Sequence, residues 1–179
     1  WKVKSPIDLF SLILNHISDK HIDKLKELIT YLSVDTDSEA LEKLEETQIR
    51  FYTNNQMISN ALKHGIYSNL AILSNIFDYD DLDKSEKIRK IVADELSSYD
   101  LKQYLSNRHF IIYFAAANPK AFLDFIFNDI QKGGVLLDAL FKGREKKMSL
   151  TGWEINYTEL IHALECLALD KRFLYEVTY

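Results

Sequence analysis

The spacing of apolar residues predicts helices along most of this chain. Ser5 and Pro6 form a helix start, because a serine side chain caps free amide groups and proline needs no hydrogen-bond partner at the first helical position. Apolar side chains then recur every three or four residues over 9–17 and again over 22–32, where charged residues occupy the opposite face. These two stripes predict a pair of helices joined as an αα-hairpin.

The same periodicity continues through the rest of the chain. Gly65 is expected to end one helix, with Lys63 and His64 suiting its negative end. Residues 110–114 have the apolar continuity of a strand, but their neighbours favour a helix. Further helices are predicted over 39–65, 67–77, 85–105, 121–130 and from about 150 to about 169. The pattern therefore predicts an all-α fold, an orthogonal or irregular bundle of about seven to eight helices.

Glycines and basic residues mark one weak candidate for a domain boundary. Gly133 and Gly134 end a helix, and a basic segment follows a short apolar stretch. This divides the chain into a helical bundle over 1–131 and a C-terminal part over 132–179, in which a basic loop precedes a helix that packs on the bundle. A single domain over 1–179 is the alternative.

Composition supports a helical protein and limits the partners and the cellular compartment that we expect for it. The 179 residues include 5 glycines and 2 prolines, few for the tight turns that strands require. A net charge of −5 gives no overall attraction to a phosphate backbone, so nucleic-acid binding requires a local basic patch. One cysteine excludes an internal disulfide and fits the reducing cytoplasm. The longest apolar run, 110–117, is too short to cross a bilayer, so we expect a cytoplasmic protein without membrane contact.

The basic loop is the candidate for contact with DNA. Lys142, Arg144, Lys146 and Lys147 place four cations within six residues, just before the predicted N-terminus of the last helix. Both features attract phosphate groups, and they predict salt-sensitive binding without sequence discrimination. The alternative, which is the more common one for such runs, is a solvated loop in which Glu145 interrupts the positive charge.

The last predicted helix carries two weaker candidate sites. Trp153 and Tyr157 present an aromatic surface or, as is more common for such pairs, pack in the core. Glu159, His162 and Cys166 share a face and are zinc-ligand types, but a structural zinc site needs four ligands and no second cluster accompanies them. We therefore expect a partly buried histidine beside a core cysteine, no metal and no cofactor. Because no phosphate-binding loop, nucleophile elbow or zinc-protease motif occurs, we do not expect an enzyme.

Three segments of the chain share a pattern with a known family. The first is 49–52, the second is an acidic stretch leading into a helix over 77–96, and the third is Thr151-Gly152 followed after six residues by 159–164. In this order they resemble the RteC family, helical regulators carried by conjugative transposons of gut Bacteroidetes, whose third segment is TG…ELIxAL. Trp153 departs from the family, where a tryptophan precedes the Thr-Gly pair.

The resemblance implies a role in the excision and transfer of a mobile element, exercised through DNA. The residues of its third segment, which we expect to be mostly structural, are Thr151, Gly152, Trp153, Glu159, Leu160, Ile161, Ala163 and Leu164.

Two functions follow from these observations. The first is a non-enzymatic helical regulator resembling RteC, which controls excision, transfer or transcription of a mobile element by binding DNA. The alternative is a helical module that binds another protein or a second copy of itself without touching DNA. The phenylalanine-rich segments 110–114 and 122–127 are its candidate surface, although their pattern favours the core.

Overall fold

The computed structural model describes residues 5–35, 58–142, 147–149, 152–154 and 157–178. Helices account for most of this part of the chain, which confirms the all-α prediction, and one short hairpin is added to them. Within these ranges no helix is both long and apolar enough to cross a membrane. In chain order the elements are α1 (Pro6–Ile13), η1 (Leu14–His16), α2 (Asp19–Ser33), α4 (Asn60–Asp80), α5 (Leu82–Ser98), α6 (Leu101–Asn107), η2 (Arg108–Phe110), α7 (Ile111–Ala117), α8 (Pro119–Gln131), α9 (Val135–Lys142), β1 (Lys147–Ser149), β2 (Gly152–Glu154), α10 (Thr158–Ala168) and α11 (Leu174–Thr178).

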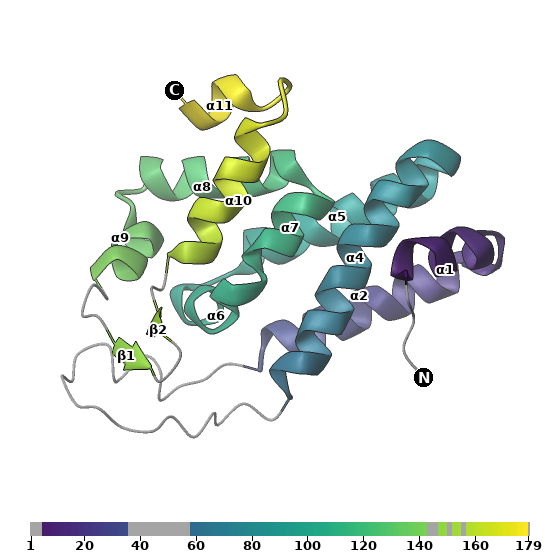
Figure 1. Ribbon diagram of the computed structural model, residues 1–179, viewed down its shortest axis with the longest axis horizontal. Coiled ribbons are helices and arrows are strands. Elements are labelled where there is room, and N and C mark those ends of the chain that lie inside the picture. Colours follow the sequence, from purple (N-terminus) through teal and green to yellow (C-terminus); the bar gives the residue numbers. More distant parts are fainter. Residues whose placement is uncertain (1–4, 36–57, 143–146, 150–151, 155–156, 179) are drawn as a thin grey trace.

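Helix α4 lies at the centre of the bundle, in contact with α1, α2, α5 and α7 (Figure 1). Helix α8 packs on α5 and α7, α9 packs on α6 and α8, and α10 packs on α7. Leu140 from α9 and Leu160 from α10 belong to the same cluster of buried residues as the interior of α4. The segment after Gly134 therefore contributes to a core that it shares with the preceding helices.

Aromatic side chains fill much of this core. The ring of Tyr67 stacks on Phe110 with 5.2 Å between the centroids and meets Phe114 edge-on at 5.1 Å. Phe114 and Phe122 have no exposed surface, and Phe125 and Phe127 pack partly buried against the cluster. The phenylalanine-rich segments therefore form the core and not a docking surface.

Local capping signals in the sequence correctly marked several helix ends. The Ser5 hydroxyl accepts a hydrogen bond from the Asp8 amide, and Pro6 occupies the first turn of α1. Asn118 and Pro119 repeat this arrangement at α8. Gly133 and Gly134 follow the end of that helix in left-handed conformations with φ of +102° and +70°, which a residue bearing a Cβ adopts only with strain.

Several predicted helix boundaries were wrong. Gly65 does not end a helix, because α4 continues through it from Asn60 to Asp80. The apolar side chains that follow Gly65 pack into the core, and this tertiary packing outweighs the local preference for a stop. The predicted helix over 85–105 is divided at Tyr99 and Asp100, where the Asp100 carboxylate accepts a hydrogen bond from the Gln103 amide and starts α6.

The predicted last helix began too early. Strands β1 and β2 pair antiparallel, with Lys147 opposite Glu154, Met148 opposite Trp153 and Ser149 opposite Gly152, and α10 begins only at Thr158. Periodicity did not distinguish these alternatives, because a short run of apolar residues fits a strand as well as a helical turn. Trp153 and Tyr157 therefore do not share a helix face.

Candidate functional site

The basic candidates lie around the connection between α9 and the hairpin. Lys142 is the last residue of α9 and Lys147 is the first residue of β1, whereas Arg144 and Lys146 lie outside the described residues. The loop between these elements is shorter than predicted, because both of its ends belong to regular structure. The basic run thus leads directly into a two-stranded ribbon.

The family-like motif is divided between the ribbon and α10. Gly152 and Trp153 belong to β2, and Thr151 lies outside the described residues, as does the earlier segment 49–52. On α10, Leu160 and Ala163 are buried and Leu164 is partly buried, whereas Ile161 is exposed and Glu159 is half-buried. The buried positions face the bundle, so this part of the motif holds α10 in place.

The outer face of α10 corrects an expectation about His162 and Cys166. Both side chains are exposed, whereas we expected a partly buried histidine beside a core cysteine. The reason is that Leu160, Ala163 and Leu167 form the inward stripe, so the residues immediately before Ala163 and Leu167 are turned about 100° away from it. The Cys166 Sγ lies 4.0 Å from each ring nitrogen of His162. Among the described residues, no three His, Cys, Asp or Glu side chains are grouped to hold a metal ion.

A histidine–tyrosine pair, which sequence reasoning missed, joins α4 to α7 close to α10. The Tyr113 hydroxyl and Nε2 of His64 are 2.5 Å apart, and the two rings meet edge-on. Burial raises the pKa of the Tyr113 hydroxyl, and the negative charge of Glu159 raises it further. The two residues are 49 positions apart in the chain, so no local sequence pattern predicts their contact.

A buried ion pair joins the chain on the two sides of 36–57. Lys63, which we expected near the C-terminal end of a helix, has no exposed surface. Its Nζ lies 3.1 Å from the Asp35 carboxylate and donates a hydrogen bond to the Asp35 carbonyl at 2.8 Å. The same carboxylate accepts a hydrogen bond from the Ile58 amide at 3.1 Å. Asp35 therefore holds Ile58 and the first turn of α4 against the end of α2. In the sequence, the burial of Lys63 is indicated by its helical spacing with Tyr67 and Leu70, which are both buried.

Polar groups are also buried deeper between α2, α4 and α5. Burial raises the pKa of Glu95, and a hydrogen bond with Ser33 partly opposes this effect. Burial likewise raises the pKa of the Tyr67 and Tyr99 hydroxyls, and the charge of Glu95 adds to it. Within the described part of the chain, both hydroxyls and Oε1 of Glu95 are buried without a hydrogen-bond partner. These groups form a buried polar cluster between the helices.

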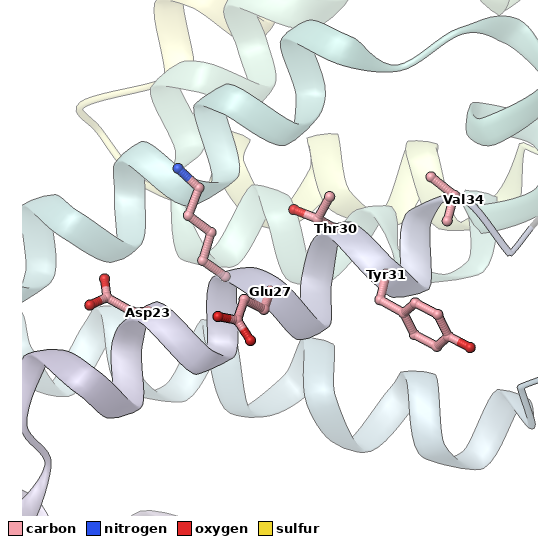
Figure 2. A pocket seen from close by; sticks show the side chains of 6 residues that line it. Asp23, Glu27, Thr30, Tyr31 and Val34 are labelled. Atoms are coloured by element: carbon pink, nitrogen blue, oxygen red, sulfur yellow. The ribbon is translucent and has the colours of Figure 1, made fainter.

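The outer face of α2 carries an open hollow of about 630 Å³ (Figure 2). Figure 2 shows that the side chains lining it come from α2 and from Val34, the residue directly after this helix. Tyr31 and Val34 are each 60% exposed, and Lys26 is tied to Asp94 of α5 at 3.4 Å. The lining residues are Asp23, Lys26, Glu27, Thr30, Tyr31 and Val34. A surface formed by one face of one helix suits contact with another macromolecule better than enclosure of a small substrate.

Comparisons of this chain with protein-family models, with curated proteins and with solved structures found no match.

Proposed function

We propose that this chain is a non-enzymatic, cytoplasmic helical regulator resembling the RteC family, which controls excision, transfer or transcription of a mobile element by binding DNA. The observation that carries the proposal is the position of the basic run. Lys142 closes α9 and Lys147 opens β1, so the basic run connects α9 to an antiparallel ribbon along the chain.

A two-stranded ribbon is one of the two kinds of element that the major groove of DNA accommodates. Each strand here has three residues, a length of roughly 10 Å, and Lys147 at the start of β1 pairs with Glu154 at the end of β2. Cations that precede such a ribbon in the chain supply affinity that does not depend on the DNA sequence. Because the chain as a whole carries a net charge of −5, repulsion between its acidic body and the phosphates orients the basic run toward DNA.

The test is the salt dependence of DNA binding by the chain with its four cations replaced by glutamine at Lys142, Arg144, Lys146 and Lys147. Each lost phosphate contact lowers the slope of log K against log salt by about 0.9, so the variant loses up to about 3.6 of the slope. Fluorescence anisotropy with a labelled duplex, recorded at salt concentrations from low to high, measures this slope.

A matched control replaces four exposed lysines on other helices, Lys20, Lys90, Lys102 and Lys120, with glutamine. This control changes the net charge by the same amount and is expected to keep most of the slope. Equal loss of slope in the two variants, or no binding by the unmodified chain at low salt, contradicts the proposal.

The second candidate function is a protein-binding module without direct DNA contact, and a specific surface favours it. Helix α1 exposes two apolar side chains, Ile7 at 58% and Leu12 at 80%, and Tyr31 and Val34 are exposed at the C-terminal end of α2. Single exposed apolar residues are ordinary, so the pair on the short helix α1 is the candidate contact. Replacing Ile7 and Leu12 with serine is expected to abolish any self-association measured by light scattering and to leave DNA binding unchanged.

A further inference from the structure

Two aromatic rings meet where the segment 143–156 leaves the helices and returns to them. Phe141 lies in the last turn of α9, and Tyr157 is the residue directly before α10. Their rings stack with 4.8 Å between the centroids and 30° between the planes, and both side chains are half-buried. Strands β1 and β2 lie between these two residues in the chain, so the stack joins the two helices that flank the ribbon.

Both helices are fixed to the core next to the stack. Leu140, directly before Phe141, is 1% exposed, and Leu160, three residues after Tyr157, is 3% exposed. The two leucines belong to the same cluster of buried residues. The stack therefore connects two helix ends that are each anchored in the core.

The start of α9 is fixed as well. Asp129, in the last turn of α8, is buried, and its carboxylate accepts hydrogen bonds from the amides of Leu136 and Leu137, each at 3.0 Å. These bonds tie the first turn of α9 to α8. Helix α9 is thus held at both of its ends, and the stack extends this rigid mount to α10.

Fixing these helix ends matters for binding, because a surface whose orientation is set beforehand loses less conformational entropy when it meets a partner. A stacked aromatic pair contributes more than the area that it buries, and the observed centroid distance lies in the range that offset-stacked rings prefer. Because both rings are half-buried, one substitution removes the stack without emptying the core.

We propose that the Phe141–Tyr157 stack is the positioning contact of the ribbon: it fixes the ends of α9 and α10 to each other and so presents β1 and β2 to DNA in a set orientation. In this role the rings act through the strands that they flank and do not themselves contact DNA. The inference rests on the proposed function, because it assigns a role in DNA binding.

Hydrogen exchange of the backbone amides of β1 and β2, measured by mass spectrometry on the whole chain, tests the positioning role without DNA. Phe141→Leu and Tyr157→Leu each remove the stack but keep an apolar side chain, and each is expected to speed this exchange about two- to tenfold. Tyr157→Phe keeps the stack and is expected to match the unmodified chain.

Phe10→Leu is the matched control. It makes the same change at a partly buried phenylalanine of α1, on the far side of the bundle from the ribbon (Figure 1). It is expected to leave the exchange of β1 and β2 unchanged. Unchanged exchange in both leucine variants of the stack, or equally fast exchange in Phe10→Leu, overturns the proposal.

Titration of the same variants with the labelled duplex tests the consequence for DNA. Because all four cations remain, loss of the stack is expected to weaken binding about two- to tenfold with an unchanged slope of log K against log salt. Replacement of the four cations lowers the slope instead, so positioning and phosphate contact are told apart. Unchanged DNA affinity in both leucine variants overturns the proposal. No DNA binding by the unmodified chain overturns the proposed function and with it this role, whereas the exchange rates decide separately whether the stack holds the ribbon.

Discussion

Lys63→Met tests how strongly a buried ion pair holds the two sides of 36–57 together. Methionine keeps a long unbranched chain in the space of Lys63 but removes the charge that lies 3.1 Å from the Asp35 carboxylate and the donor to the Asp35 carbonyl. Removing one member of a buried pair costs about 3–5 kcal/mol, since the other charge stays in a poorly solvated place. Because Asp35 keeps 10% of its side chain exposed, we expect the lower end, about 3 kcal/mol.

Urea unfolding followed by far-UV circular dichroism measures this loss. Lys24→Met is the matched control, because Lys24 pairs with Glu27 at 2.5 Å but about two thirds of each side chain is exposed. Its expected cost is below about 0.5 kcal/mol. In the double variant Lys63→Met with Asp35→Asn, asparagine still accepts the Ile58 amide, so the combined loss should fall short of the sum by about 2 kcal/mol. Equal effects of Lys63→Met and Lys24→Met would refute the reasoning from burial.

Two further predictions concern pH and backbone conformation. Since burial raises the pKa of Glu95 above its ordinary value of about 4.5, the folded state binds the proton more tightly than the unfolded chain, and stability falls as pH rises from that value through the folded pKa. Glu95→Gln should reduce this loss of stability with rising pH. Unfolding midpoints of both proteins at a series of pH values measure the loss, and parallel curves for the two proteins would contradict the prediction. Gly65→Ala should raise the free energy of unfolding by about 1 kcal/mol, because Gly65 is inside α4 with nothing within 4 Å of an added Cβ. Gly134→Ala should lower it by about 1 kcal/mol because of the left-handed φ, and a change of the same sign at both positions would count against the argument.

The sequence predicted what depends on local chemistry and missed what depends on contacts between distant segments. Ser5-Pro6 and Asn118-Pro119 started helices as expected, because capping involves only neighbouring residues. The prediction that Gly65 ends a helix failed for the opposite reason, since the packing of the whole α4 helix outweighs the preference of one residue. No local pattern in the sequence predicts the contact of His64 with Tyr113 or of Lys63 with Asp35, because each contact joins two segments that are distant in the chain.

The candidate site shows the same division. Helical spacing correctly placed Glu159, His162 and Cys166 on one helix, yet which side faces the core depends on where α7 lies against α10. The structure turns Leu160 and Ala163 inward and the His162–Cys166 pair outward, so the expected core contact of this pair does not form. Spacing thus predicts which residues share a face, and packing decides what that face meets.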